Sequence, residues 1–330
     1  MRCPTLAELP PPPPDKTGWP WTEETPPLPE SMPDGSPWPR ISIVTPSYNQ
    51  GQFIEETIRS ALLQGYPNLE YIIIDGGSTD NSVEIIKKYE PWLAYWVSEP
   101  DHGQSHAINK GIQKATGDIL LWINSDDICL TSSFTKATLV FYSNPNSGLV
   151  TGQAWVINHL GQNVGELRSN FTTWEELATN PRNSIRQIST FFARKVFDEL
   201  GLVDENLHIA MDTELLVRIT KLYPPLVLED YLTAYRVHSE TKTFHQLIRG
   251  YQESDQTRPK YLAGVNLICQ YRRRSSLNWL SLSESQIYPL RERAICLYYA
   301  LKNRPSVIYS RNFWSSLKKL AKDFLHNHRS

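Results

Sequence analysis

One short segment, Gly117–Asp127, constrains the fold of this chain more than any other. Its middle, Ile119–Ile123, is continuously apolar, which predicts a strand buried on both faces of a sheet. Asn124, Ser125, Asp126 and Asp127 follow at once. Open α/β sheets bind ligands at the carboxyl ends of their strands, and adjacent carboxylates there favour a hard divalent cation. The same residues also fit a simple Asp-rich turn, so the choice depends on the rest of the chain.

Length and composition describe an ordinary globular protein, with one large domain plus appendages or with two small domains. The 330 residues are 40% hydrophobic and 21% charged, and the net charge of -2 argues against a nucleic-acid partner. Charge is uneven, since residues 245–330 carry 15 Lys and Arg against 5 Asp and Glu. Four cysteines without metal-binding spacing, and no apolar run long enough to cross a bilayer, predict a cytoplasmic protein.

The first 39 residues are rich in proline, including Pro10–Pro14, and contain Trp19, Trp21 and Trp38. Proline fixes φ and removes backbone donors, so we expect an extended segment without a core of its own. The sequence allows two placements of this segment. The segment could be a ligand for a polyproline-binding partner, or a tail that lies across its own domain through the tryptophans, and the second is the one we expect.

From Arg40 onward, segments with strand and helix periodicity alternate. This alternation predicts a parallel, doubly wound sheet whose polar strand ends, Thr45–Asn49, Asp75–Ser78 and Asn124–Asp127, share one edge. Residues 158–186 give no assignable pattern. The predicted elements are strands over 41–45, 71–74, 93–97, 119–123 and 148–157, a strand and then a helix over 188–201, a strand pair over 226–237, and helices over 53–62, 82–89, 107–115, 134–142 and from Met211.

Two common phosphate-binding patterns are absent from the sequence. No GxGxxG follows the first strand, and GxxxxGK[ST] occurs nowhere, which excludes a dinucleotide dehydrogenase and a P-loop enzyme. A nucleotide could still be held by carboxylates at its base and ribose, with its diphosphate neutralised by a metal ion.

Six motifs occur in an order and spacing that resemble the family-two glycosyltransferases of the GT-A type. The resemblance covers about residues 40–243 and implies a single GT-A domain there, with a nucleotide-binding half over 40–127 and an acceptor half over 128–243. The proline-rich tail, 1–39, and a helical, basic extension, 244–330, flank it. The motifs are Thr45–Asn49, Asp75–Asp80, Asp101–Ser105 leading to Ala107–Gly111, Asn124–Asp127, Met211–Asp212 and Tyr235–His238.

The resemblance also implies an activity. A hexose-type sugar would pass with inversion from a nucleoside-diphosphate sugar, foremost a UDP-sugar, to a hydroxyl of a glycan or lipid-linked acceptor. The reaction would use Mn²⁺ or Mg²⁺ and serve the synthesis of a cell-surface polysaccharide or glycoconjugate.

Site residues follow from the resemblance position by position. Asp212 would be the general base that takes the acceptor's proton, with helix capping as the alternative role. Asn124 departs from the family pattern, because it replaces the first carboxylate of the Asp-x-Asp metal motif and brings one negative charge fewer. The implied donor-binding residues are Pro46, Tyr48, Asn49, Asp75, Gln104, Asn109 and Asn124, and the implied metal ligands are Asp126, Asp127 and His238.

Two other functions stay open. A sugar nucleotidyltransferase usually has a basic, Gly-rich loop after the first strand, which this chain lacks. A nucleotide-sugar-binding module that has lost its chemistry is favoured by Asn124 alone. Near the C-terminus, 312–326 has an apolar stripe beside Lys318, Lys319 and Lys322. This stripe could contact the inner face of a membrane, or it could dock on the protein itself.

Overall fold

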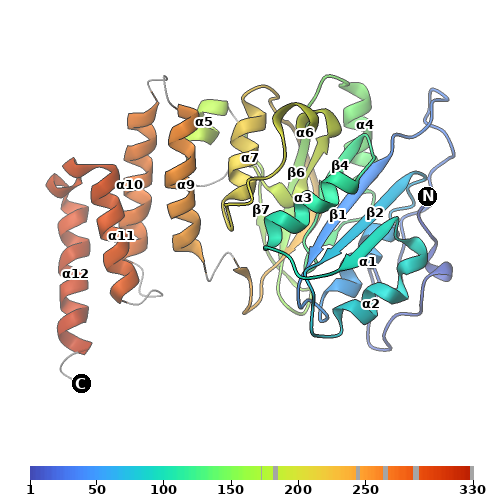
Figure 1. The fold of residues 1–330 in the computed structure, drawn as a ribbon, viewed down its shortest axis with the longest axis horizontal. Helices are drawn as coiled ribbons and strands as arrows, with labels where there is room; N and C mark the ends of the chain where they lie inside the picture. Colours follow the sequence, from blue (N-terminus) through green and yellow to red (C-terminus); the bar gives the residue numbers. More distant parts are fainter. Residues whose placement is uncertain (172, 181–184, 243–245, 263–266, 285–289, 328–330) are drawn as a thin grey trace. The chain divides into compact units, whose positions relative to one another are not determined.

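The computed structural model describes residues 1–171, 173–180, 185–242, 246–262, 267–284 and 290–327. These residues form two compact units, which are described separately (Figure 1). The first unit lies within residues 1–171 and 184–241, and the second within 172–183 and 242–330. The expected domain boundary between 243 and 244 lies outside the described residues.

The first unit is built on a mixed sheet of nine strands, in the order β3-β2-β1-β4-β8-β6-β9-β5, with β7 paired to β6. β1, β2, β3 and β4 are parallel, whereas β8 runs antiparallel to both β4 and β6. The strands are β1 (Ile41–Ser47), β2 (Leu69–Asp75), β3 (Tyr95–Ser98), β4 (Ile119–Trp122), β5 (Ile128–Cys129), β6 (Leu149–Ile157), β7 (Asn163–Leu167), β8 (Thr190–Ala193) and β9 (Leu226–Arg236).

Helices connect these strands at the positions where the sequence has helical periodicity. α3 packs against β1 and β2, and α4 packs against β6 and β9. The α-helices of this unit are α1 (Ile54–Leu62), α2 (Ser82–Lys88), α3 (Gln104–Lys114), α4 (Ser133–Ser143), α6 (Arg194–Leu200) and α7 (Met211–Thr220), and the 3-10 helices are η1 (Leu6–Glu8), η2 (Glu90–Trp92) and η3 (Gln187–Ser189). The α/β fold is therefore confirmed, with a sheet that is parallel over β1–β4 and mixed over its remaining strands.

The register of the sheet brings the three polar strand ends to one edge, as expected. Ser47 lies opposite Asp75, and Val44 lies opposite Trp122, the last residue of β4. β4 pairs with β1 only as far as Val44. Pro46 therefore has a paired strand, β2, on one side only. A proline without an N–H is tolerated there, because it removes no bond from a two-sided ladder.

Two expectations from the sequence need correction. Residues 226–237 do not form a strand pair, because β9 is one continuous strand along β6. The polar pair Glu229 and Asp230 resembles a turn, but both side chains are exposed and shifts in register accommodate them within the strand. Residues 158–186 contain structure that periodicity did not reveal, namely β7 in the first unit and α5 (Trp174–Thr179) in the second.

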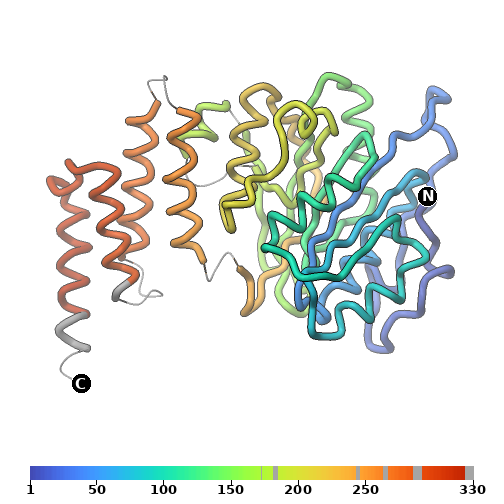
Figure 2. The backbone as a smooth tube through the Cα atoms, viewed as in Figure 1, coloured from blue at the N-terminus to red at the C-terminus, as the bar shows by residue number. Residues whose placement is uncertain are grey.

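The proline-rich tail lies against the first unit, as its tryptophans predict (Figure 2). The Trp19 indole N–H donates to the carbonyl of Cys129 at 2.9 Å. Arg59 on α1 is fully buried, and its guanidinium donates to the carbonyls of Pro10, Pro20 and Trp21. A chain rich in proline has few donors of its own, so the arginine satisfies tail carbonyls that would otherwise be buried without partners.

The second unit is helical and has its own apolar core, in which Trp279, Leu297 and Phe313 are buried. On α12, Leu317 and Leu320 also pack on this core, so part of the predicted stripe faces the protein. Within the described residues, no helix is long and apolar enough to cross a membrane. Besides α5, the helices are α9 (Leu247–Leu262), α10 (Ile268–Glu284), α11 (Leu290–Asn303), η4 (Pro305–Tyr309) and α12 (Arg311–Asn327).

Candidate functional site

Asp126 and His238 meet at the carboxyl edge of the sheet, although they are 112 residues apart in the chain. Nε2 of His238 lies 3.1 Å from Oδ2 of Asp126. Both side chains keep some exposure, 7% for His238 and 19% for Asp126, and Phe53 packs its ring against the imidazole. A carboxylate and an imidazole nitrogen are both good ligands for Mn²⁺ and related ions.

Asp127, the next residue, is completely buried and its carboxylate is occupied by the protein. Oδ1 accepts the backbone N–H of Arg236 at 2.9 Å, and Oδ2 accepts from the Asn124 amide at 3.1 Å. Burial raises the pKa of Asp127, and the nearby charge of Asp126 raises that pKa further. These bonds link the end of β4 to the end of β9, a role that the sequence did not suggest for Asp127.

The amide of Asn124 bonds in both directions. Its Nδ2 donates to Asp127, and its Oδ1 accepts from Nε2 of Gln104 at 2.8 Å. A carboxylate at position 124 could accept the second bond but could not donate the first, and it would place two acceptors against each other. The departure from the Asp-x-Asp pattern therefore fits the buried Asp127 beside it.

Arg236 fixes the turn that carries Asp126. Its guanidinium is 1% exposed, donates to the Asp126 carbonyl at 2.8 Å and pairs with Glu56 of α1 at 2.9 Å. The same group stacks over the Phe53 ring, with its central carbon 4.9 Å from the ring centroid. Arg236 lies within the predicted Tyr235–His238 motif, but no local pattern distinguishes it from its neighbours there.

The predicted nucleoside side of the edge is organised by Asp75, which is fully buried. Its carboxylate accepts hydrogen bonds from the Gly77 and Ser78 backbone N–H groups and from the Ser78 and Ser98 hydroxyls. Asp75 thus shapes the loop after β2, and its contact with a base stays a prediction.

The neighbouring loop after β1 places the other predicted nucleoside residues. Pro46 is buried within β1, and Tyr48 is 60% exposed. Asn49 has a left-handed backbone, with φ of 52°, and its Oδ1 accepts the Thr79 N–H at 2.9 Å. Asparagine tolerates this conformation better than most residues, so the two loops are joined without severe strain.

α3 contributes residues at the opposite side of the same edge. Ser105, in its first turn, is buried and donates to the carbonyl of Leu207 at 2.7 Å. Asn109, one turn later, is also buried and binds the backbone of Val203. Both side chains therefore fasten the segment 203–207, which leads into α7.

Asp212 lies in the first turn of α7, and its Oδ1 accepts the N–H of Thr213 at 2.6 Å. α7 packs against η3. Burial lowers the pKa of Arg186, which directly precedes η3, and the charge of Asp212 partly opposes that shift. Glu214, two residues later, is 5% exposed and paired with Arg218 at 2.8 Å.

The edge is suited to a metal ion that the substrate helps to bind. Among the described residues, no cluster of three or more His, Cys, Asp or Glu side chains could hold a metal alone. Asp126 and His238 could supply two ligands, and ions such as Mg²⁺ are commonly held by one or two protein ligands together with substrate phosphates and water. The residues present thus fit a divalent ion completed by a diphosphate.

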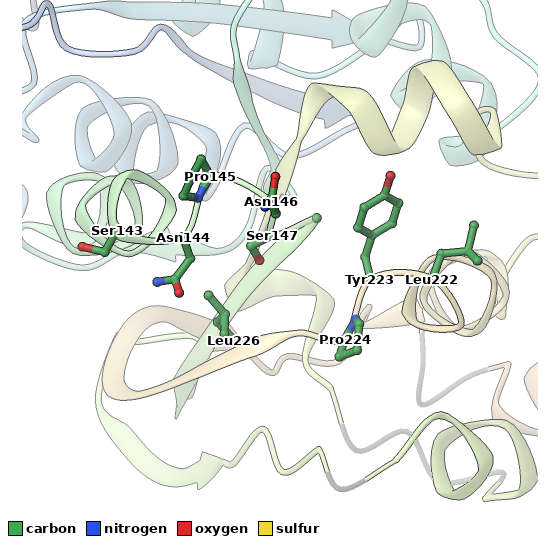
Figure 3. A pocket seen from close by; sticks show the side chains of 10 residues that line it. Ser143, Asn144, Pro145, Asn146, Ser147, Leu222, Tyr223, Pro224 and Leu226 are labelled. Atoms are coloured by element: carbon green, nitrogen blue, oxygen red, sulfur yellow. The ribbon is translucent and has the colours of Figure 1, made fainter.

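A separate hollow lies at the opposite, amino-terminal edge of the sheet (Figure 3). Its volume is about 500 Å³, and it lies between the segments 143–148 and 222–226. None of the predicted site residues lines it. The side chains that Figure 3 labels are uncharged, and they include Asn144, Asn146 and Tyr223.

Residues 42–201 match the family model described as glycosyl transferase family 2. An uncharacterised glycosyltransferase of Mycobacterium tuberculosis is 42% identical over 90 residues, which are 27% of this chain and 34% of that protein. TuaG of Bacillus subtilis, named as a teichuronic acid biosynthesis glycosyltransferase, is 37% identical over 92 residues, 27% of this chain and 36% of TuaG. The chain thus matches about a third of the length of these relatives.

Two solved structures resemble the chain over most of its length. TarS 1-349 of S. aureus in complex with UDP-GlcNAc has a TM-score of 0.53 and 16% identity, covering 86% of this chain and 92% of that one. The mannosyltransferase PcManGT from Pyrobaculum calidifontis, in complex with GDP-Man and Mn²⁺, has a TM-score of 0.52 and 16% identity, covering 88% and 87%. At this identity the likeness establishes the fold.

The fold is of the GT-A type. The order of the strands, the polar edge of the sheet and the likeness to these solved structures all indicate it. This fold agrees with the match of residues 42–201, just under half of the chain, to glycosyl transferase family 2.

Proposed function

We propose that this protein is an inverting glycosyltransferase that moves a sugar from a nucleoside-diphosphate sugar to an acceptor hydroxyl. One observation carries the proposal, namely the pairing of Asp126 with His238 at the edge where β1, β2 and β4 end. The family supports the reaction class. The nucleotide sugars bound to TarS and PcManGT support UDP- or GDP-linked donors, with a UDP-sugar as the first candidate.

The residues at this edge divide into three roles. Asp126 and His238 would hold Mn²⁺ or Mg²⁺, which acts as a Lewis acid on the diphosphate leaving group. Asp75, Asn49, Tyr48 and Pro46 would form the nucleoside side, and Gln104 with Asn124 the side of the diphosphate and sugar. Asp212 would accept the acceptor's proton, and attack from the face opposite the leaving group would invert the anomeric carbon.

The acceptor follows less directly from the residues. Likeness to TuaG supports a cell-surface polysaccharide or glycoconjugate, and we propose a glycan or lipid-linked acceptor. We also propose action in the cytoplasm, with contact to the inner face of the membrane through 312–326. On α12, Trp314 is exposed and Lys318 and Lys322 lie one and two turns further along the same helix, which supports that contact.

The experiment measures nucleoside diphosphate released from UDP- and GDP-sugars by the full chain, with Mn²⁺ or with EDTA. We expect release that requires an acceptor and falls in EDTA, and an anomeric configuration in the product opposite to that of the donor. Asn124 specifically favours one other function, a nucleotide-sugar-binding module. That module would bind the nucleotide in calorimetry and release none, and this result would replace the proposal.

A further inference from the structure

Arg186 is a partly buried cation that forms no ion pair within the part of the chain that the structure describes. Its Nε is buried and has no hydrogen-bond partner. None of the ion pairs found among the described residues includes it. A guanidinium keeps its proton at all ordinary pH values, so its burial costs free energy that a partner must offset.

Three hydrogen bonds fix the backbone of Arg186. The N–H of Arg186 donates to the Ser169 hydroxyl at 3.1 Å. Its carbonyl accepts the Thr190 hydroxyl at 2.8 Å and the Ser189 N–H at 3.0 Å. A side chain that starts from a backbone with three such bonds is poised in one region, as a binding residue requires.

The surroundings of Arg186 place it at the candidate site. The next residue, Gln187, is buried and donates to the carbonyl of Trp122 at 2.9 Å, two residues before Asn124. On its other side stands α7, and the charge of Asp212 acts on the guanidinium. The backbone next to Arg186 is thus joined to the end of β4 through Gln187, and the guanidinium lies within electrostatic reach of Asp212 in the first turn of α7.

We propose that Arg186 is an oxyanion-binding residue of the candidate site, and that it binds a phosphate group. A planar guanidinium matches the oxygens of phosphate in pairs, and it binds them most strongly where water is partly excluded. The proposal rests on the proposed function for its setting. The charge of the site agrees with this role. Asn124 brings one negative charge fewer than the aspartate of the family pattern, and Arg186 adds a fixed positive charge, so both residues favour an anion.

Two phosphates could occupy this position, the diphosphate of the donor and a phosphate carried by the acceptor. Inorganic pyrophosphate represents the first and sn-glycerol 3-phosphate the second. Because neither probe contains a nucleoside or a sugar, both test the anion site independently of donor identity. Calorimetry is performed on the full chain in EDTA, so that no metal ion contributes to binding.

We expect wild-type protein to bind one of the two probes and Arg186→Met to bind it at least tenfold more weakly, with Arg186→Lys in between. Loss of pyrophosphate affinity assigns the donor diphosphate, and loss of glycerol phosphate affinity alone assigns the acceptor. The matched control is Arg168→Met, which removes an exposed arginine of the same unit that is paired with Glu166. This variant should bind like wild type.

Three results would overturn the proposal. They are no binding of either probe by wild type, equal affinity in Arg186→Met, and an equal loss in Arg168→Met. If Arg186→Met does not fold, as judged by its circular dichroism, the comparison of wild type with Arg186→Lys decides in the same way. The two proposals fail in different experiments. If the proposed function is wrong, wild-type protein releases no nucleoside diphosphate from sugar donors but still binds the anion probe.

Discussion

The side chain of Asn109 holds the backbone of Val203 from both sides. Its Oδ1 accepts the Val203 N–H at 3.0 Å, and its Nδ2 donates to the Val203 carbonyl at 2.9 Å and to Glu205 at 2.8 Å. The asparagine is 4% exposed. α3, which begins at the donor side of the edge, is thereby connected to the segment that leads into α7 and Asp212.

Asn109→Ala should lower the free energy of unfolding by about 1–3 kcal/mol, because it leaves buried backbone groups of Val203 without partners. We expect transfer to fall as well, since the segment before Asp212 loses its support, whereas nucleotide affinity should change little. Urea unfolding and calorimetry measure the two effects. Asn146→Ala, at an exposed asparagine, is the control. A tenfold loss of nucleotide affinity at unchanged stability would instead make Asn109 a donor ligand, as the sequence predicts.

The adjacent carboxylates Asp126 and Asp127 should respond differently to substitution. Asp126→Ala should abolish the increase in nucleotide affinity that Mn²⁺ provides, because it removes one of two protein ligands. Asp127→Asn keeps an oxygen that can accept the Arg236 N–H, but its new NH2 group faces the NH2 group of Asn124, and both are donors. The substitution should therefore mainly lower the free energy of unfolding, by about 1–2 kcal/mol. Titrations of UDP and GDP with and without Mn²⁺ measure the difference. Equal loss of the Mn²⁺ effect in both variants would make Asp127 a ligand too.

The sequence predicts the edge of the sheet well, because buried parallel strands are continuous apolar runs and their polar ends are conspicuous. It cannot tell which of two adjacent carboxylates turns inward. For Asp127 that choice is made by the Arg236 N–H, 109 residues later in the chain. Local patterns carry no information about such a distant partner.

Arg186 shows the same limit more clearly. It follows a polar stretch without periodicity, and nothing nearby in the sequence marks it as a site residue. Its position depends on the bond between Gln187 and Trp122, which joins segments 65 residues apart. The family motifs locate Asn109 on a helix near the donor, but they do not say that its amide points to Val203.

The exposed face of α12 leads to a prediction about membranes. Phe313 is buried in the helical unit, whereas Trp314 is 52% exposed, and both Lys318 and Lys322 are exposed. We expect the protein to co-sediment with vesicles that contain anionic lipid more than with neutral ones, since each cation near such a surface contributes about 1 kcal/mol. Trp314→Ala should reduce the binding, and Leu277→Ala, at an exposed leucine of α10, should not. Equal pelleting with both lipids would remove the contact.

Asp255 should be the most sensitive carboxylate of the second unit. It accepts hydrogen bonds from four side chains of α10 and α11, namely Tyr271 and Ser275 at 2.6 Å and Trp279 and Asn303 at 2.7 Å. Asp255→Asn can keep only one acceptor oxygen, so donors on the other side lose their partner, at a cost of about 2 kcal/mol or more. Thermal unfolding followed by circular dichroism measures the loss. Glu292→Gln on α11 should leave the transition unchanged, and an equal shift in both variants would contradict the role of Asp255.

Asp212 is the general base that we propose for the transfer. A carboxylate with an ordinary pKa near ~4 is a weak base, so its contribution depends on position. Asp212→Asn retains an oxygen that can accept the Thr213 N–H, and so folding and donor binding should survive. Transfer should fall by about 10²–10⁴-fold, which is the usual contribution of a positioned general base. Glu214→Gln provides the contrast, because Glu214 is buried against Arg218 and its loss should lower stability more than transfer at saturating substrate. Transfer at the wild-type rate by Asp212→Asn, or retention of the donor's anomeric configuration in the product, would contradict this mechanism.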